Sequence, residues 1–260
     1  MTPLALALAL LVHPPFEVAP AAGPDVWLAF AGDIAADDAA RLRPVTGPLA
    51  QADLAIQIGS RLSDTTTRAV LDDIGFDVLV RDGDPRVTRR DFGSACVVVL
   101  GGPPDRIDAL LDRVAKGPCF VAVAARWSGI GKGGLPGKAE RDLARSFVAR
   151  GADLVVGQHP GAPAGVGWQD GTPIIWSVGS FFAADAGETG VFRARLTPTA
   201  TGLALAEVDL KPLVYDAATQ RMRTPKEAEV DAISASAARR SRLVGGQATL
   251  EAAHIVFHPR

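Results

Sequence analysis

Three polar residues stand directly behind apolar runs, at points where a strand would end and a loop begin. Asp33 follows Ala-Phe-Ala-Gly, Arg126 follows Ala-Val-Ala-Ala, and His159 follows Val-Val-Gly-Gln. A carboxylate in such a place can hold a hard cation, and an imidazole can ligate a metal or act as a general acid. Taken singly, a Gly-Asp turn and a lone His are equally typical of helix caps and hydrogen-bonded loops.

A Gly-rich loop at residues 129–138 offers a second kind of chemistry, which is anion binding. Its two lysines, Lys132 and Lys138, could act with Arg126 and the N-terminus of the following helix on a phosphate or carboxylate. The loop is not a Walker-type phosphate loop, because Lys132 stands where that motif needs a Gly and because Ala139 follows Lys138. The alternative interpretation is a surface loop without a ligand.

The elements that position these residues follow from the hydrophobic pattern. Short apolar runs alternate with helical patterns at residues 104–114 and 139–150, which predicts a parallel sheet buried on both faces. We expect strands at residues 25–31, 54–58, 76–80, 96–100, 119–123, 154–156 and 174–178. The polar residues above then lie at carboxyl ends of strands, where α/β sheets carry their ligands.

The C-terminal third has a different pattern. A two-residue period over residues 193–196 and 203–214 predicts an antiparallel pair, and residues 227–243 form a last helix. The polar segment 81–92 is expected to be a loop. We therefore predict one α/β domain over residues 25–245, followed by a C-terminal tail at 246–260. His254 and His258 lie in that tail, where we assign no metal site.

The segments around Asp33, Arg126 and His159, together with Trp176-Ser-Val-Gly-Ser180-Phe, resemble the CapA-type capsule and poly-γ-glutamate biosynthesis proteins. That family has a strand ending Gly-Asp, then His-Trp-Gly, then Gly-Ala-Asp followed by Gly-x-His-Pro-His, and then Tyr-Ser-Leu-Gly-Asn-Phe. The resemblance covers about residues 25–235 and is most specific at 140–182. It implies a metallophosphoesterase-like α/β sandwich, with a largely parallel core sheet and antiparallel C-terminal strands.

Most metal-ligand positions of the family are changed in this sequence. Only Asp33 and His159 match ligand positions, whereas Arg126 replaces the His of His-Trp-Gly and Ser180 replaces the Asn of Leu-Gly-Asn. A two-metal site needs several convergent carboxylate, amide and imidazole ligands. The resemblance thus implies a metal-depleted member without a cofactor, and manganese or zinc at Asp33 and His159 only if a metal is bound.

Arg126 points to a specific replacement for that metal. A guanidinium is always protonated and has no lone pair for a metal ion, so it would repel a divalent cation and attract Asp33. We expect Arg126 to pair with Asp33 and to bind an anionic group with Lys132, Lys138, Gln158 and Ser180, with His159 and Asp33 as the catalytic candidates if activity remains.

Composition limits the other classes of function. Apolar residues make up 48% and charged residues 22% of the chain, and the net charge of −2 provides no basic field for nucleic acid. Residues 1–22 contain a Leu- and Ala-rich run of about nine residues, which favours a signal peptide over a disordered cytosolic leader. No later segment predicts a membrane span. Cys96 and Cys119 could pair if their strands are neighbours, although two reduced core cysteines is the favoured interpretation.

Three functions stay open at this stage. The first is a CapA-like protein, exported to the periplasm or beyond, which binds an anionic envelope polymer, a phosphate-bearing ligand or an envelope biosynthesis protein. The second is an active metal-dependent phosphoesterase, with substitute carboxylates from Asp82, Asp84 or Asp91. The third is a pseudoenzyme that acts only through a protein interface.

Overall fold

The structure is a computed structural model, and its described part begins at Gly23. It describes residues 23–34, 49, 51–59, 76–80, 85–114, 117–127, 130–131, 135–159, 161, 163–182, 187–216, 218–219 and 221–260. The expected leader at residues 1–22 and the lysine Lys132 lie outside these ranges. So do Asp82, Asp84 and the side chain of Asp33.

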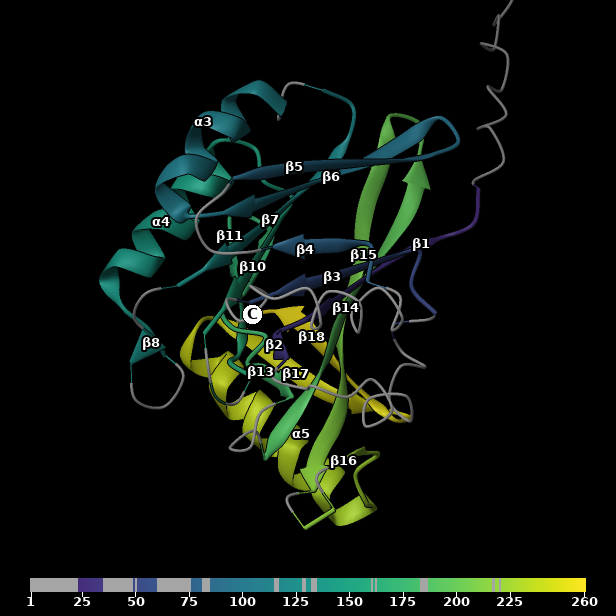
Figure 1. The fold of residues 1–260 in the computed structure, drawn as a ribbon, viewed down its shortest axis with the longest axis vertical. Coiled ribbons are helices and arrows are strands. Elements are labelled where there is room, and N and C mark those ends of the chain that lie inside the picture. Colours follow the sequence, from purple (N-terminus) through teal and green to yellow (C-terminus); the bar gives the residue numbers. More distant parts are fainter. Residues whose placement is uncertain are drawn as a thin grey trace, which may run out of the picture.

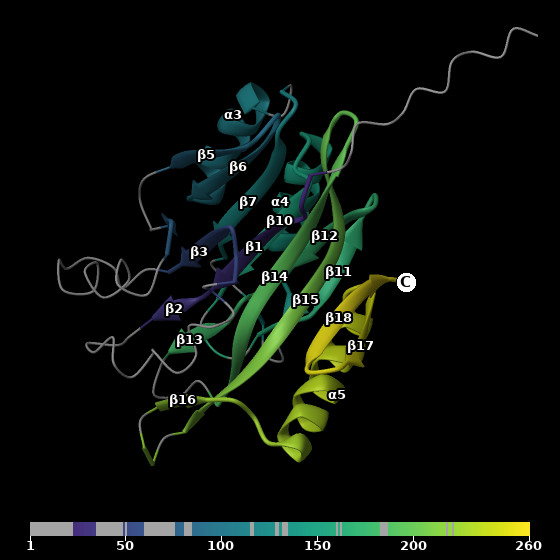
Figure 2. The same ribbon diagram turned by 90° about the vertical axis from the view of Figure 1, so that its right-hand side faces the viewer.

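Two β-sheets pack face to face and enclose the main core (Figures 1 and 2). The first sheet has the order β17 (Gly246–Glu251), β18 (His254–Pro259), β15 (Gly202–Asp216), β14 (Glu188–Thr199), β1 (Val26–Ala31), β3 (Leu54–Ile58) and β4 (Val78–Val80), with β16 (Arg221–Arg223) beside β15. The second has the order β11 (Val166–Gln169), β12 (Thr172–Ile175), β10 (Leu154–Gln158), β7 (Phe120–Arg126), β6 (Ala95–Gly102) and β5 (Arg86–Phe92).

The direction of the strands agrees with the sequence pattern. In the second sheet β6, β7, β10 and β12 are parallel, and their continuous apolar runs are buried on both faces. In the first sheet β14, β15 and β18 are antiparallel, whereas β1, β3 and β4 are parallel. The predicted α/β sandwich is confirmed.

Helices cover the outer face of the second sheet. In α3 (Pro104–Val114), Ile107 and Leu111 are spaced by four residues and are fully buried. In α4 (Lys138–Ala149), Phe147 is likewise fully buried. These side chains pack on the outward residues of β6 and β7. The third helix, α5 (Glu227–Leu243), packs beside β17 and matches its predicted bounds. None of the described helices is both long and apolar enough to cross a membrane.

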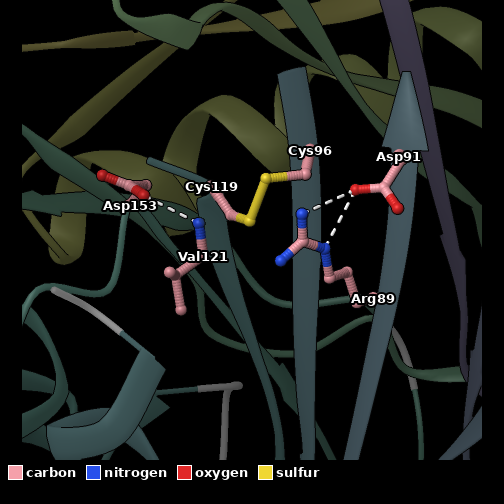
Figure 3. The surroundings of a disulfide bond; sticks show 6 residues. All are labelled: Arg89, Asp91, Cys96, Cys119, Val121 and Asp153. Atoms are coloured by element: carbon pink, nitrogen blue, oxygen red, sulfur yellow. Dashed lines mark hydrogen bonds and ion pairs between the residues drawn. A yellow bond between two sulfur atoms is a disulfide. The ribbon is translucent and has the colours of Figure 1, made fainter. Parts of the chain in front are cut away.

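Cys96 and Cys119 form a disulfide, so the favoured expectation of two reduced core cysteines is wrong (Figure 3). The cause is register: Val97 on β6 pairs with Phe120 on parallel β7, which sets the preceding cysteines side by side with Cα atoms 4.6 Å apart. That separation lies within the range that a disulfide needs. The bond ties together the amino ends of two central strands.

Two further segments differ from expectation. Residues 86–92, expected as loop, form the edge strand β5, whose side chains are all exposed or half-buried, so they carry no apolar alternation. Residues 246–260, expected as a tail, form the hairpin β17–β18, and β18 pairs with β15 because Ile255 and Phe257 are buried in the main core.

Two short sheets complete the fold at the carboxyl edge and in the Gly-rich loop. β2 (Asp33–Ile34) pairs in parallel with β13 (Ser180–Phe182), with Asp33 opposite Ser180. β8 (Ile130–Gly131) pairs with β9 (Leu135–Pro136) just before α4. The first of these pairs joins the end of β1 to the segment after β12.

Candidate functional site

The four segments selected from the sequence meet at one edge of the sandwich. Arg126 and Gln158 are register partners at the carboxyl ends of β7 and β10, and the Trp127 N–H donates to the Gln158 carbonyl at 3.0 Å. Asp33 pairs with Ser180 through β2 and β13. The Val178 N–H donates to the Gly157 carbonyl at 2.9 Å and links the last two segments. The expected convergence of strand ends is therefore present.

Close backbone approach explains two glycines of these segments. A Cβ atom on Gly32 would lie 1.7 Å from the Gly179 carbonyl oxygen, and one on Gly157 would lie 1.8 Å from Nε1 of Trp127. No side chain fits at either position without moving the backbone or the indole. These glycines hold the end of β1 against the segment after β12 and the end of β10 against Trp127.

Hydroxyl groups fix the backbone around His159. The Ser177 Oγ accepts hydrogen bonds from the N–H groups of His159 and Gly179, each at 3.0 Å. The Ser180 Oγ accepts from the Gly161 N–H at 3.1 Å, and the Gly161 carbonyl accepts from the Ser180 N–H at 2.7 Å. His159 is thus half-buried, on a backbone held from both sides.

Gln57 is a residue of this edge that sequence reasoning did not select. It is fully buried at the end of β3, opposite Ala31, and its Nε2 donates to the Gly32 carbonyl at 3.1 Å. Its Oε1 has no hydrogen-bond partner among the described residues. The signal for it was present, since Gln57 is the one polar residue in the buried strand Leu-Ala-Ile-Gln-Ile.

The described side chains do not fit a two-metal centre. Besides His159, the strand ends present the amides Gln57 and Gln158, the guanidinium of Arg126 and the hydroxyl of Ser180. Neutral amide oxygens and a fixed positive charge are poor surroundings for two adjacent divalent ions, which require several carboxylates and imidazoles. We therefore derive no chemical step through a metal.

Two other sequence-selected residues fall outside this group. Lys138 begins α4 with an 88% exposed side chain and forms an ion pair with Asp142 at 2.5 Å, one helical turn further on. Asp91 pairs with Cys96 at the beginning of β6, hence at the amino edge of the sheet, so it cannot supply a ligand next to His159. The proposed Arg126–Asp33 ion pair and the role of Lys132 stay predictions, because both involve groups outside the described part.

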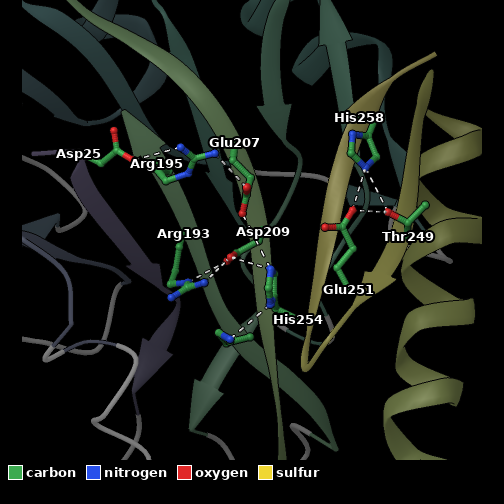
Figure 4. Close-up of polar contacts among 10 residues, drawn as sticks. Asp25, Arg193, Arg195, Glu207, Asp209, Thr249, Glu251, His254 and His258 are labelled. Carbon is green, nitrogen blue, oxygen red and sulfur yellow. Dashed lines mark hydrogen bonds and ion pairs between the residues drawn. The ribbon is translucent and has the colours of Figure 1, made fainter. Parts of the chain in front are cut away.

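A second polar cluster lies on the outer face of the first sheet (Figure 4). Glu207, Asp209 and His254 each offer one ligand atom, and these atoms lie within 4.8 Å of one another. Asp209 already holds the Arg193 guanidinium, and Nζ of Lys211 lies 3.5 Å from Nδ1 of His254. Arg195 is in turn bonded to Glu207 at 3.2 Å. Three positive neighbours thus offset the carboxylates, so we interpret the cluster as an ion-pair network of the sheet.

Burial and neighbouring charges affect the pKa of Lys211 in that network. Desolvation lowers the pKa of Lys211, the charge of Arg193 lowers it further, and Asp209 and Glu207 act in the opposite direction. The sequence signal for this cluster is the alternation Arg193-x-Arg195 opposite Glu207-x-Asp209, which puts opposite charges on one face of neighbouring strands.

Comparison with known proteins supports the resemblance over the middle of the chain. Residues 69–185 match the family model described as "Bacterial capsule synthesis protein PGA_cap". No curated protein matches the chain. Among solved structures, a conserved uncharacterized protein from Streptococcus pneumoniae, a predicted phosphoesterase, aligns with 11% identity and a TM-score of 0.39, covering 74% of this chain and 91% of that one.

Proposed function

We propose that this chain, similar to the bacterial capsule synthesis proteins over residues 69–185, is an envelope protein that binds an anionic group at the carboxyl edge of its sheets. The observation that carries the proposal is the position of Arg126. Arg126 is the last residue of β7, in register with Gln158, which directly precedes His159 in the chain. A permanent cation among amide, hydroxyl and imidazole donors suits a carboxylate or phosphate oxygen.

Export is supported by the disulfide. Protein disulfides persist in oxidising compartments and are rare in the reducing cytosol. The Cys96–Cys119 bond therefore agrees with a signal peptide at residues 1–22, and an exported protein would meet the envelope polymers that a capsule synthesis protein handles. We propose an anionic polymer of the envelope as the ligand, with poly-γ-glutamate as the first candidate.

The test is binding of two defined probes, inorganic phosphate and a short oligomer of γ-linked glutamate, measured by isothermal titration calorimetry. We expect Arg126→Gln to weaken binding of either probe about tenfold or more, since charge-assisted hydrogen bonds to the anion are lost. Arg141→Gln is the matched control, because Arg141 is exposed on α4. Equal loss in both variants, or none in either, would refute the assignment of the site.

The second candidate is the metal-dependent phosphoesterase, and His159 at a strand end is the observation that keeps it testable. Equilibrium dialysis against manganese or zinc, followed by a phosphodiester hydrolysis assay, separates the two functions. Two tightly bound ions and hydrolysis lost in His159→Asn would replace our proposal. Phosphate binding that is independent of added metal would favour it.

A further inference from the structure

A cavity of about 580 Å³ opens at the amino edge of the second sheet, away from the site described above. It lies between the first residues of β15, the end of β18 and the β11–β12 hairpin, and its lining includes the aromatic residues Trp168 and Phe257. Its volume is in the range of ligand-binding pockets in proteins.

A β-bulge creates this opening. Arg195 pairs with Glu207 and Leu196 pairs with Leu205, so Ala206 is an extra residue on β15. A bulge bends its strand and strengthens the local twist. Consistently, β18 pairs with β15 only at residues 208–210, and no strand in the described ranges pairs with residues 203–207 on the side away from β14.

The hydrogen-bond phase of the β14–β15 hairpin determines which main-chain groups face the opening. Thr199 and Gly202 close a two-residue turn, and such a closing pair exchanges its hydrogen bonds. The next pair, Pro198 with Leu203, is then of the non-bonded type, which suits a proline without an N–H group. By the same alternation Leu203 and Leu205 turn their N–H and C=O groups away from β14, and both residues line the cavity.

The side chains around this open strand edge are acidic. Asp153, Asp170 and Glu207 line the cavity together with His258, and no Lys or Arg is among its described lining residues. Glu207 is bonded to Arg195 at 3.2 Å and His258 lies 3.9 Å from Glu251, so Asp153 and Asp170 are the cavity carboxylates without an ion pair among the described residues. Burial raises the pKa of the Asp153 carboxyl, and the Val121 N–H, at 2.7 Å, is the hydrogen bond that opposes this rise. A cationic ligand would lower this cost of burying the carboxylate.

We propose that this cavity binds an extended, basic peptide segment of a partner protein, which adds as a strand to Leu203–Leu205 of β15. Strand addition uses the open main-chain groups for affinity, and alternate side chains of the peptide face one wall each. Lysine or arginine on one side of the peptide would meet Asp153 and Asp170, while apolar residues on the other side would meet Trp168 and Phe257. Unpaired strand edges of this kind are the usual places at which a strand of another chain adds.

The probe is an acetylated, amidated pentapeptide of alternating Val and Lys, compared with the same peptide in which Glu replaces Lys. We expect the Lys peptide to bind at least tenfold more tightly, as measured by calorimetry, and to protect the amides of Leu203 and Leu205 from hydrogen exchange. N-methylation of either the three Val or the two Lys nitrogens tests the strand geometry, because only one of these two sets faces β15.

Protein variants test the charge. The double variant Asp153→Asn/Asp170→Asn should bind the Lys peptide about tenfold more weakly, and asparagine tolerates the positive φ of 50° at residue 170. Asp231→Asn is the matched control, because Asp231 is exposed on α5, and this variant should bind as the parent protein does. Circular dichroism confirms that each variant is folded.

Three outcomes would overturn the proposal. The first is equal binding of the Lys and Glu peptides, which removes the charge argument. The second is equal binding of both N-methylated peptides, which removes strand addition and leaves a small amine or a sugar as the occupant. The third is no binding of any peptide at millimolar concentration.

Discussion

Arg193 on β14 and Asp209 on β15 face each other as cross-strand partners and form a bidentate ion pair on the outer face of the first sheet (Figure 4). The Asp209 side chain is fully buried, and the Arg193 guanidinium lies 4.5 Å from the centre of the Trp27 ring. The pair therefore joins β1, β14 and β15 through charge and through stacking of the guanidinium on the indole.

Replacement of Asp209 by Asn should destabilise the protein strongly. It leaves the Arg193 guanidinium buried without a carboxylate, at a cost of about 3–5 kcal/mol in the free energy of unfolding. Glu207→Gln is the matched control, because Glu207 is half-buried and its ion pair with Arg195 is worth about 1 kcal/mol or less. Urea denaturation measures both values. Equal losses in the two variants would contradict the special role of the buried pair.

Substitution of Gly32 by Ala should damage the carboxyl edge itself. The added Cβ would lie 1.7 Å from the Gly179 carbonyl oxygen, so the end of β1 must move away from the segment that carries Ser180. We expect a loss of about 1–3 kcal/mol in unfolding free energy together with weaker phosphate binding. Gly117→Ala, where the nearest atom is 3.4 Å away, should change neither property appreciably. Unchanged binding in Gly32→Ala would separate this contact from the site.

The sequence predicts the parallel half of the fold well because its strands are continuous apolar runs. Residues 104–114 and 227–243 also end at the observed helix bounds, since their polar flanks mark the ends. The edge strand β5 escapes detection for a physical reason: all of its residues are exposed or half-buried, and it lacks the alternation that identifies a strand.

The meeting of the strand ends was predictable from the sequence, whereas the full set of side chains at that edge was not. Strand ends in a parallel sheet meet at one edge, so Arg126, His159 and Ser180 could be grouped from the sequence. Gln57 and the cavity beside β15 depend on packing and on a β-bulge, which no local pattern encodes. Likewise, the disulfide required the register of β6 and β7, which apolar runs alone leave undetermined.

Glu229, in the first turn of α5, should titrate at unusually low pH. Hydrogen bonds from the Arg223 guanidinium, at 2.6 and 2.7 Å, lower its pKa to about 2, and the Lys226 N–H contributes as well. Because the folded-state pKa lies below the ordinary value of 4.5, this contribution to stability is present above pH 4.5 and is lost as the pH falls toward 2. Carbon-detected NMR titration should show the pKa returning toward 4.5 in Arg223→Gln. A pKa that stays near 2 would assign the shift to the helix terminus instead.

Removal of the disulfide should lower stability without abolishing the fold. The Cys96–Cys119 bond closes a loop with a sequence separation of 23, for which chain entropy predicts about 3 kcal/mol. In a domain of this size that corresponds to a melting temperature about 6–12 °C lower. The variant Cys96→Ala/Cys119→Ala should melt at the same temperature with and without dithiothreitol, whereas the parent protein should lose stability when reduced. If the melting temperature of the parent protein does not change with the reductant, the two thiols are unpaired. The disulfide would then no longer support export.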